Sequence, residues 1–383
     1  MALPPFHQNP EMTLGQKLLR VNWGLVLVIT LLAGIGCVML YSAANGQMEP
    51  WAARQAVRYA AGLGLTLAIA LIDVRFLFRW AWIAYLGALA LLVAVEVMGT
   101  IGMGAQRWID LKVIQLQPSE LMKVAMILAL ARYFHGLSEE EIARPLNLIP
   151  PLLVLAAPTA LVVQQPDLGT AVMLAMVAGA LFFAAGVRLW KFGILAGLAA
   201  VAVPIAWQML HGYQKQRILT FLDPSRDPLG AGYHITQSKI ALGAGGLFGK
   251  GFLQGSQSHL NFLPEKQTDF IFTMLAEEFG MLGGLGLLGL FTVIFAYGLL
   301  IALRSRSHFG RLLALGLTVN LFLYVFINIA MVMGLIPVVG VPLPLISYGG
   351  TAMLAAMISF GLLISVHVHR EIRIPRRGLE DNA

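Results

Sequence analysis

The sequence predicts an all-α polytopic membrane protein with about ten transmembrane helices, a long extracytoplasmic segment between the seventh and eighth helices, and both termini in the cytoplasm. Of its 383 residues, 58% are hydrophobic and only 12% are charged, whereas soluble domains are about half apolar and a quarter charged. The apolar residues gather in long runs, and the basic residues are distributed unequally between the segments that join these runs. This small number of polar residues cannot cover the surface of a globule of this length. Apolar side chains must therefore face lipid as well as one another.

Ten stretches are long and apolar enough to be spans, since crossing the hydrocarbon core takes about 20 mainly apolar residues. They cover residues 23–43, 55–72, 78–97, 118–134, 147–163, 168–186, 192–210, 271–303, 312–335 and 348–369. The eighth stretch is too long for one crossing. Residues 281–303 can cross alone, which leaves residues 269–280 as an interfacial, re-entrant or protruding helical stretch.

The orientation follows from the excess of Lys and Arg in short cytoplasmic segments. With the amino terminus inside, the inner segments carry fifteen basic residues, and the short outer segments with the start of the fourth span carry five. The remaining six lie in the long outer segment. We therefore expect a cytoplasmic segment at 1–22, one transmembrane domain at 23–370 that includes the outer segment 211–268, and a cytoplasmic tail at 371–383. The net charge of +7 does not indicate nucleic-acid binding, because the basic residues form no dense patch.

The outer segment 211–268 is too long for a simple connection, and long connections tend to be functional. It contains a turn-like stretch at 223–228, an amphipathic stretch at 233–242 and a glycine-rich stretch at 243–251. Apolar and aromatic residues over 240–262 predict packing on the bundle or in the headgroup region rather than an irregular connector. We interpret the glycines as permitting tight turns. Phosphate contact is the less favoured alternative, because the Gly-Lys-Ser/Thr ending of a nucleotide-binding loop is missing.

Ionisable residues within or at the edge of spans are functional candidates. Glu120 and Lys123 lie three positions apart, so they share a helix face and can pair. The alternative to a chemical role is a neutralised pair that only orients the helix. Asp167 precedes the sixth span, where it is either a helix cap or a chemical group.

Thr268 and Asp269 stand where the long outer segment meets an apolar helix. A carboxylate in that place can be partly desolvated, which favours a base. Either residue can instead be a simple helix cap. Glu277 and Glu278 point in different directions on a helix, and we favour a structural or interfacial role for them.

Taken together and in order, these stretches resemble the SEDS family, the proteins of shape, elongation, division and sporulation, over roughly residues 23–370. The resemblance is carried by GAQRWID at 104–110, QPSE at 117–120, QPDLGT at 165–170, GKG at 249–251, FLPE at 262–265, TDFIF at 268–272 and PVVGVPLPLISYGGT at 337–351. Residues 104–108 and 338–342 resemble the elongation branch more than the division branch. Many relatives carry a histidine before the threonine of the sixth motif. This chain has Gln267 there, which leaves more weight on Asp269.

The resemblance implies a peptidoglycan glycosyltransferase of the bacterial cytoplasmic membrane, which polymerises lipid II into glycan strands on the periplasmic side during cell elongation. Asp269 would be the general base for the 4-hydroxyl of the acceptor GlcNAc, with undecaprenyl pyrophosphate as leaving group. Arg107 would face the pyrophosphate, because a guanidinium matches phosphate oxygens in a fork. Lys123 is a second candidate for this contact, and Lys250 is a weaker one. Lys123 can instead hold Glu120. The expected substrate-binding set is Arg107, Glu120, Lys123, Asp167, Lys250 and Thr268.

The resemblance also implies partners: a class B penicillin-binding protein that supplies transpeptidation, and further membrane proteins of the elongation complex. A divalent cation would suit pyrophosphate chemistry, but the sequence shows no complete metal-ligand set. Two rival functions remain open, a lipid II flippase and a non-catalytic scaffold of the wall-synthesis complex. A flippase needs charges along a crossing path, whereas a polymerase needs its key carboxylate at the outer face, where Asp269 is expected.

Overall fold

The computed structural model describes residues 12–102, 105–110, 115–209, 212–227, 230–260, 262 and 265–375. The beginning of the expected N-terminal segment and the end of the expected tail lie outside the described residues. So do Gly104, Pro228, Leu263 and Pro264, which belong to stretches singled out above.

Each of the ten expected spans overlaps one helix. These helices are α2 (Trp23–Ala43), α3 (Ala52–Ala70), α4 (Val74–Met98), α5 (Pro118–His135), α7 (Ile149–Gln164), α8 (Leu168–Ala184), α9 (Leu189–Met209), α13 (Ile271–Arg304), α14 (His308–Val332) and α15 (Gly350–Val368). Among the described residues, six helical segments are long and apolar enough to cross a membrane: α2, α4, residues 145–164, α13, α14 and α15. The helix α8 and the first part of α9 are shorter apolar helices. The chain is thus a mostly helical, multi-pass membrane protein.

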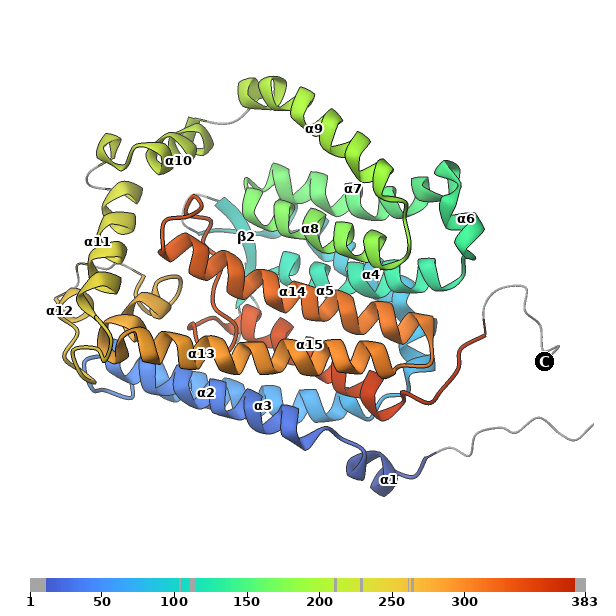
Figure 1. Ribbon diagram of the computed structural model, residues 1–383, viewed down its shortest axis with the longest axis horizontal. Coiled ribbons are helices and arrows are strands. Elements are labelled where there is room, and N and C mark those ends of the chain that lie inside the picture. The colour runs from blue at the N-terminus through green and yellow to red at the C-terminus, as the bar shows by residue number, and fades with distance from the viewer. Residues whose placement is uncertain are drawn as a thin grey trace, which may run out of the picture.

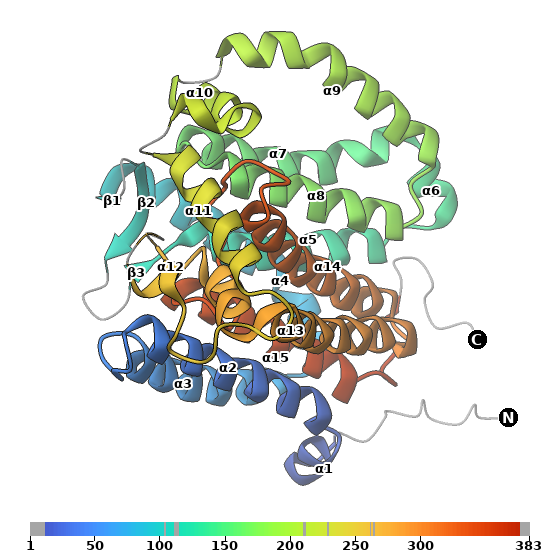
Figure 2. The same ribbon diagram turned by 60° about the vertical axis from the view of Figure 1, so that its left-hand side comes forward.

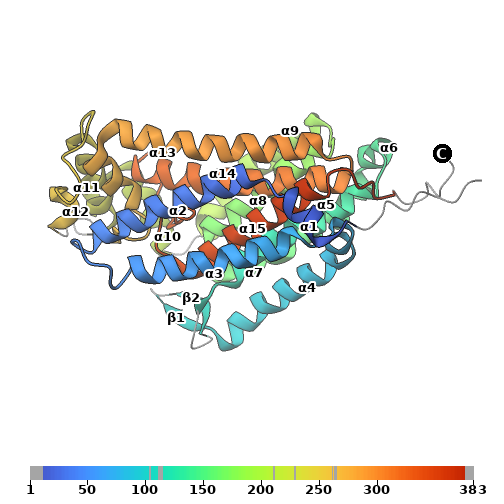
Figure 3. The ribbon, with the colours of Figure 1, turned by 90° about the horizontal axis from the view of Figure 1, so that it is seen from below.

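The helices form a bundle with two distinct ends. One end holds α1 (Leu14–Leu19), α6 (Glu139–Ala143) with the 3-10 turn η1 (Pro145–Leu148), and the chain after α15; the other holds α11 (Ala231–Ala244) and α12 (Ser256–His259). Figure 3, seen from below, separates the same two ends. In Figure 2, α9 and α10 (Gly212–Leu222) arch over α7 and α8, and η2 (Pro224–Arg226) leads to α11. The long segment therefore lies at the end opposite to α1.

The core of the bundle is formed by its last helices. In the most apolar stretches of α14 and α15, 72% and 78% of the residues are buried, compared with 28% in α4 and 22% in residues 145–164. The helix α5 lies against α4 and α14, and α15 lies against α3. The peripheral helices thus turn most of their apolar side chains outward, as lipid contact requires, while α5, α14 and α15 can carry buried polar groups.

A small sheet corrects the all-α expectation. Three antiparallel strands, β1 (Thr100–Gly102), β2 (Ala105–Asp110) and β3 (Gln115–Leu116), lie in the order β1-β2-β3 between α4 and α5. In its register, Ile109 of β2 pairs with Leu116 of β3. The strands have three, six and two residues, which is too short for an alternating pattern to stand out in the sequence.

The helix α13 is broken at Gly280, where φ is 68° and ψ is −164°. The break falls where the sequence separates residues 269–280 from the span that follows. In an unbroken helix, the amides of Met281 and Leu282 would donate to the carbonyls of Glu277 and Glu278. The break frees these four backbone groups, and buried backbone groups need other partners.

The glycine-rich stretch supplies those partners. The amides of Lys250 and Gly251 donate to the two freed carbonyls over 3.0 Å each, and the carbonyls of Gly246 and Leu247 accept from the two freed amides over 2.9 and 3.2 Å. Tight turns at the glycines, as expected, make this possible, since Gly246, Gly249 and Gly251 all have positive φ. The stretch is therefore a backbone clamp on the first part of α13.

Candidate active site

Asp269 lies directly before the N-cap residue of α13, at the bundle end that carries the long segment. The side chain of Asn328, on α14, donates to the backbone carbonyl of Asp269 over 2.9 Å and to that of Val341 over 2.7 Å. Asn328 is fully buried. The N-cap of α13 is Phe270, with no side-chain capping bond, so neither Thr268 nor Asp269 caps this helix.

The carboxylate of Asp269 is half-buried and faces the connection between α14 and α15. A Cβ added at Gly340 would lie 3.3 Å from Asp269 Oδ2. Gly340 has φ +77°, a conformation that favours glycine. The backbone of this connection therefore passes beside the carboxylate without a side chain between them.

The turn before α13 is held from several directions. The hydroxyl of Thr268 donates to Glu265 Oε2 over 3.0 Å, and the hydroxyl of Ser347 donates to the carbonyl of Thr268 over 2.6 Å. The amide of Tyr348 donates to the carbonyl of Gln267 over 2.8 Å. These bonds fix the backbone on both sides of the turn, so Asp269 is presented from a rigid support.

Arg107 projects from β2 toward the turn between α7 and α8. Its Nε donates to the carbonyl of Gln165 over 3.0 Å, a terminal nitrogen donates to the carbonyl of Pro166, and Nη1 lies 4.0 Å from Asp167 Oδ2. Asp167 accepts from the amide and the hydroxyl of Thr170 at 3.2 and 2.9 Å. The predicted capping of this helix by Asp167 is confirmed, and the guanidinium retains a partly exposed face.

The connection between α14 and α15 lies against both the start of α8, which Asp167 caps, and the carboxylate of Asp269. A Cβ on Gly169, in the first turn of α8, would lie 2.0 Å from Cγ1 of Val339. Val339 precedes Gly340, which faces Asp269. Two successive residues of one connection thus contact the helix capped by Asp167 and the carboxylate of Asp269. Arg107, Asp167 and Asp269, distant in sequence, converge there.

Glu120 and Lys123 form the predicted pair, with 2.7 Å between Lys123 Nζ and Glu120 Oε1. Lys123 is 1% exposed and Glu120 is 5% exposed. The hydroxyl of Tyr324 donates to the other oxygen of Glu120, and the ammonium of Lys123 lies 4.3 Å from the centre of the Tyr324 ring. Lys123 was expected either to face the pyrophosphate or to hold Glu120, and in this geometry it holds Glu120.

Lys250 does not lie with Arg107, Asp167 and Asp269. Its ammonium lies 3.0 Å from Glu277 Oε1 and 2.6 Å from the hydroxyl of Ser256. Glu277 is eight residues after Asp269, roughly 12 Å farther along the helix axis. The neighbouring Glu278 accepts from Ser42 and from His259. Both carboxylates therefore tie the long segment and α2 to α13.

Sequence reasoning missed three contributors, Tyr324, Asn328 and Gly340. A buried asparagine in an apolar helix is a detectable signal, because polar groups are costly there. Lys266, in the same turn as Asp269, is also buried, and burial lowers the pKa of its ammonium. Among the described residues, no three His, Cys, Asp or Glu side chains gather as a metal site.

Comparison with known proteins identifies the family. The sequence profile of the FtsW/RodA/SpoVE family, described as cell cycle protein, matches residues 22–372. The chain is 45% identical over 370 residues to peptidoglycan glycosyltransferase MrdB of Escherichia coli K12, covering 95% of this chain and 98% of that protein.

Solved structures give the same result. One chain of a peptidoglycan synthase complex, studied for its coordination of polymerization and crosslinking, superposes with a TM-score of 0.79 at 35% identity, covering 91% of this chain and 98% of that one. The rod shape determining protein RodA of Thermus thermophilus superposes with a TM-score of 0.70 at 30% identity, covering 92% and 98%. The expected resemblance is confirmed, and the chain belongs to the FtsW/RodA/SpoVE family of cell cycle proteins.

Proposed function

We propose that this chain is a peptidoglycan glycosyltransferase that polymerises lipid II into glycan strands during cell elongation. The relative from Escherichia coli is named a peptidoglycan glycosyltransferase, and the chain aligns with it over nearly its whole length. The observation that carries the mechanism is the half-buried carboxylate of Asp269, held on a rigid turn beside the side-chain-free Gly340. A carboxylate so placed can meet a hydroxyl that enters from the bundle end.

We place ten spans in the bacterial cytoplasmic membrane, with both termini in the cytoplasm and the 211–268 segment in the periplasm. The separation of α1 and the chain after α15 from α11 and α12 supports this arrangement (Figure 1). So does the excess of basic residues in the segments assigned to the inside. The domain limits stay at 1–22, 23–370 and 371–383.

In the proposed reaction, the 4-hydroxyl oxygen of the acceptor GlcNAc attacks the anomeric carbon of MurNAc on the donor. Asp269 takes the proton of that hydroxyl, and the bond from the anomeric carbon to undecaprenyl pyrophosphate breaks. Partial burial makes a carboxylate a better base, because it disfavours the charged form. The side chain of Asn328 fixes the backbone of Asp269 through its carbonyl, and not through its carboxylate.

The leaving pyrophosphate needs positive charge as it departs. Arg107 is our candidate for this contact, since its side chain is 25% exposed and its other bonds go to backbone carbonyls. We assign Asp167 to orienting Arg107, and Thr268 to shaping the turn. We assign the buried Glu120–Lys123 pair, with Tyr324, to supporting the site from within the bundle.

The divalent cation that would suit pyrophosphate chemistry stays a prediction. The described residues offer no cluster of three metal-ligating side chains. Asp269 and Arg107 together supply a base and a cation, which are the two groups that the substitution needs.

We further propose a class B penicillin-binding protein as the crosslinking partner, along with other membrane proteins of the elongation complex. The similar chain from a peptidoglycan synthase complex supports such an assembly, because that complex couples polymerization to crosslinking.

The test combines the purified protein, its transpeptidase partner and labelled lipid II. Wild type should form glycan strands that moenomycin does not block, and Asp269→Ala should form none. Asp223→Ala is the matched control, because Asp223 is an exposed carboxylate of the same outer segment, and it should polymerise normally. Movement of lipid II between leaflets without polymer would establish the flippase alternative, and neither activity would favour the scaffold.

A further inference from the structure

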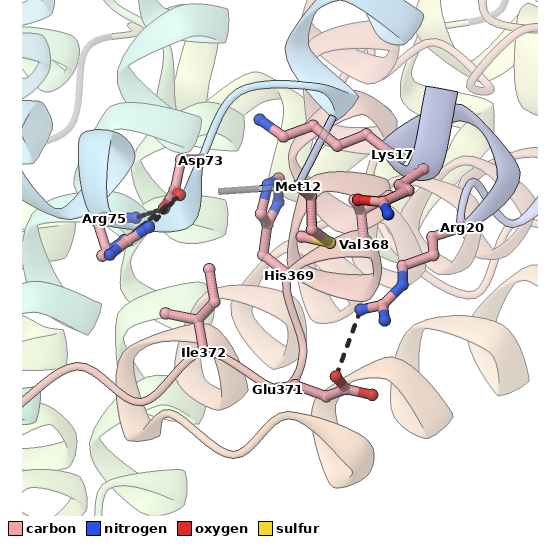
Figure 4. Close-up of a pocket in the computed structure, with 10 residues that line it drawn as sticks. Met12, Lys17, Arg20, Asp73, Arg75, Val368, His369, Glu371 and Ile372 are labelled. Carbon is pink, nitrogen blue, oxygen red and sulfur yellow. Dashed lines mark hydrogen bonds and ion pairs between the residues drawn. The ribbon is translucent and has the colours of Figure 1, made fainter. Parts of the chain in front are cut away.

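A second polar site lies at the end of the bundle opposite to Asp269. A cavity of about 500 Å³ opens where α1, the turn between α3 and α4, and the end of α15 meet (Figure 4). This volume falls in the range of about 300–1,000 Å³ that small ligands occupy. The charged and titratable residues of its lining are Lys17, Arg20, Asp73, Arg75, His369 and Glu371.

The cavity has an excess of positive charge. Both carboxylates already have partners: Asp73 lies 2.9 Å from Arg75, and Glu371 lies 3.3 Å from Arg20. Lys17 donates to the carbonyl of Leu71 over 2.9 Å and forms no ion pair within the described part of the chain. One cation is therefore left without a countercharge, which favours an anionic ligand.

His369 indicates a second property of the ligand, a hydrogen-bond donor. Figure 4 shows its ring between the Asp73–Arg75 pair and Lys17, and the charges of all three act on it. The ring is 98% buried, being 2% exposed, and Nδ1 lies 2.9 Å from the carbonyl of Ser365. Nδ1 therefore carries the proton, and Nε2 is an acceptor.

Nε2 of His369 has no hydrogen-bond partner among the described residues, although it is buried. Buried polar atoms are normally paired. The cavity thus has a place for a hydroxyl donor beside a place for an anion.

The surroundings of the cavity are apolar and exposed. Leu14 is 67% exposed, Leu18 39%, Leu19 84% and Trp23 52%, all in α1 and the start of α2. Leucine and tryptophan beside basic residues are typical of segments that lie in the membrane interface. A ligand in the cavity can therefore extend acyl chains along this face.

We propose that the cavity binds the headgroup of an anionic phospholipid, with its phosphate at Lys17 and Arg20 and a headgroup hydroxyl donating to Nε2 of His369. Phosphatidylglycerol carries both groups. Basic pockets between helices at the membrane surface are suited to such headgroups. The lipid would join α1 and the end of α15 to the α3–α4 turn. This site is independent of the proposed reaction.

The test measures lipid binding to the full-length protein after delipidation in detergent, by native mass spectrometry with phosphatidylglycerol and phosphatidylcholine as probes. Wild type should prefer phosphatidylglycerol by about tenfold, and Lys17→Gln should lower that preference by about fivefold, since one cation near a membrane surface contributes about 1 kcal/mol. His369→Phe should weaken binding, and His369→Gln, which keeps an acceptor, should restore most of it. Arg188→Gln, an exposed arginine on another connection, is the matched control.

Equal binding of the two lipids by wild type would overturn the proposal, and that comparison needs no variant to fold. An equal loss in Arg188→Gln would also overturn it, because the effect would then be one of general charge. Excess glycerol 1-phosphate separates the two sources of this chemistry. It should not displace the lipid, and displacement would assign the cavity to a soluble phosphate ester instead.

Discussion

Gly249 is the position where one added methyl group should most disturb the outer end of the bundle. In Gly249→Ala, the new Cβ would lie 2.1 Å from the carbonyl oxygen of Glu278 and 2.6 Å from the amide nitrogen of Phe279. Both are backbone atoms, so no side-chain rotation relieves the contact. The φ of +82° adds a penalty of about 1–2 kcal/mol for a left-handed L-residue.

The contact must widen by about 1 Å, because separations under 3.0 Å are essentially never observed for a real Cβ. That shift pulls the amides of Lys250 and Gly251 away from the α13 carbonyls that they satisfy. Two lost hydrogen bonds cost about 1 kcal/mol each. With the backbone penalty, we expect Gly249→Ala to lower the free energy of unfolding by about 3–4 kcal/mol.

The assay is reversible unfolding in detergent, with Gly243→Ala as the matched control. Gly243 lies in α11, and an added Cβ there meets nothing within 4 Å. Alanine in a helix should make this control more stable by about 0.5–1 kcal/mol. If Gly249→Ala unfolds within about 0.5 kcal/mol of wild type, the glycine-rich stretch does not clamp the break in α13, and the reasoning fails.

Three further predictions concern charged and titratable groups. Lys123→Met should lower the free energy of unfolding by about 3–5 kcal/mol, because it leaves Glu120 buried without its partner; combining it with Glu120→Gln should recover most of that loss in the same unfolding assay. Arg107→Lys should lower the polymerisation rate without unfolding the protein, because an ammonium cannot bond both backbone carbonyls and pyrophosphate in a fork; a wild-type rate would contradict this. Burial lowers the pKa of His234, so the unfolded state binds the proton more readily and stability is lost as the pH falls through about 6.5. His234→Phe should flatten the loss of melting temperature between pH 7 and 5, and an unchanged acid profile would contradict the assignment.

Hydropathy predicted stretches that each overlap a helix, because a span must be apolar along about 20 residues. Six helical segments of the described residues are long and apolar enough to cross a membrane. The Glu120–Lys123 pair and the Asp167 cap were also predictable, since each depends on residues three positions apart. The partners Tyr324 and Asn328 were not, because they come from α14. Tyr324 is 204 residues from Glu120 in sequence, and Asn328 is 59 residues from Asp269. Such contacts depend on how the helices pack, which periodicity does not encode.

The structure of the outer segment 211–268 was also only partly predictable from the sequence. The amphipathic stretch at 233–242 lies within α11, and the turn-like stretch at 223–228 contains η2, but the helices α10 and α12 were not predicted. The role of the glycines was visible only once Gly280 broke α13 beside them. A glycine can signal a tight turn in sequence, whereas the backbone it approaches is fixed by the fold.

The proposed base is tested most directly by Asp269→Asn, which keeps the shape of the side chain but removes its capacity to accept the proton. The measurement is the single-turnover polymerisation rate with saturating lipid II, together with lipid II binding. We predict a rate at least about 100-fold lower with binding unchanged, since general base catalysis contributes about 10²–10⁴-fold. An Asp269→Asn variant that polymerises at the wild-type rate would contradict the account.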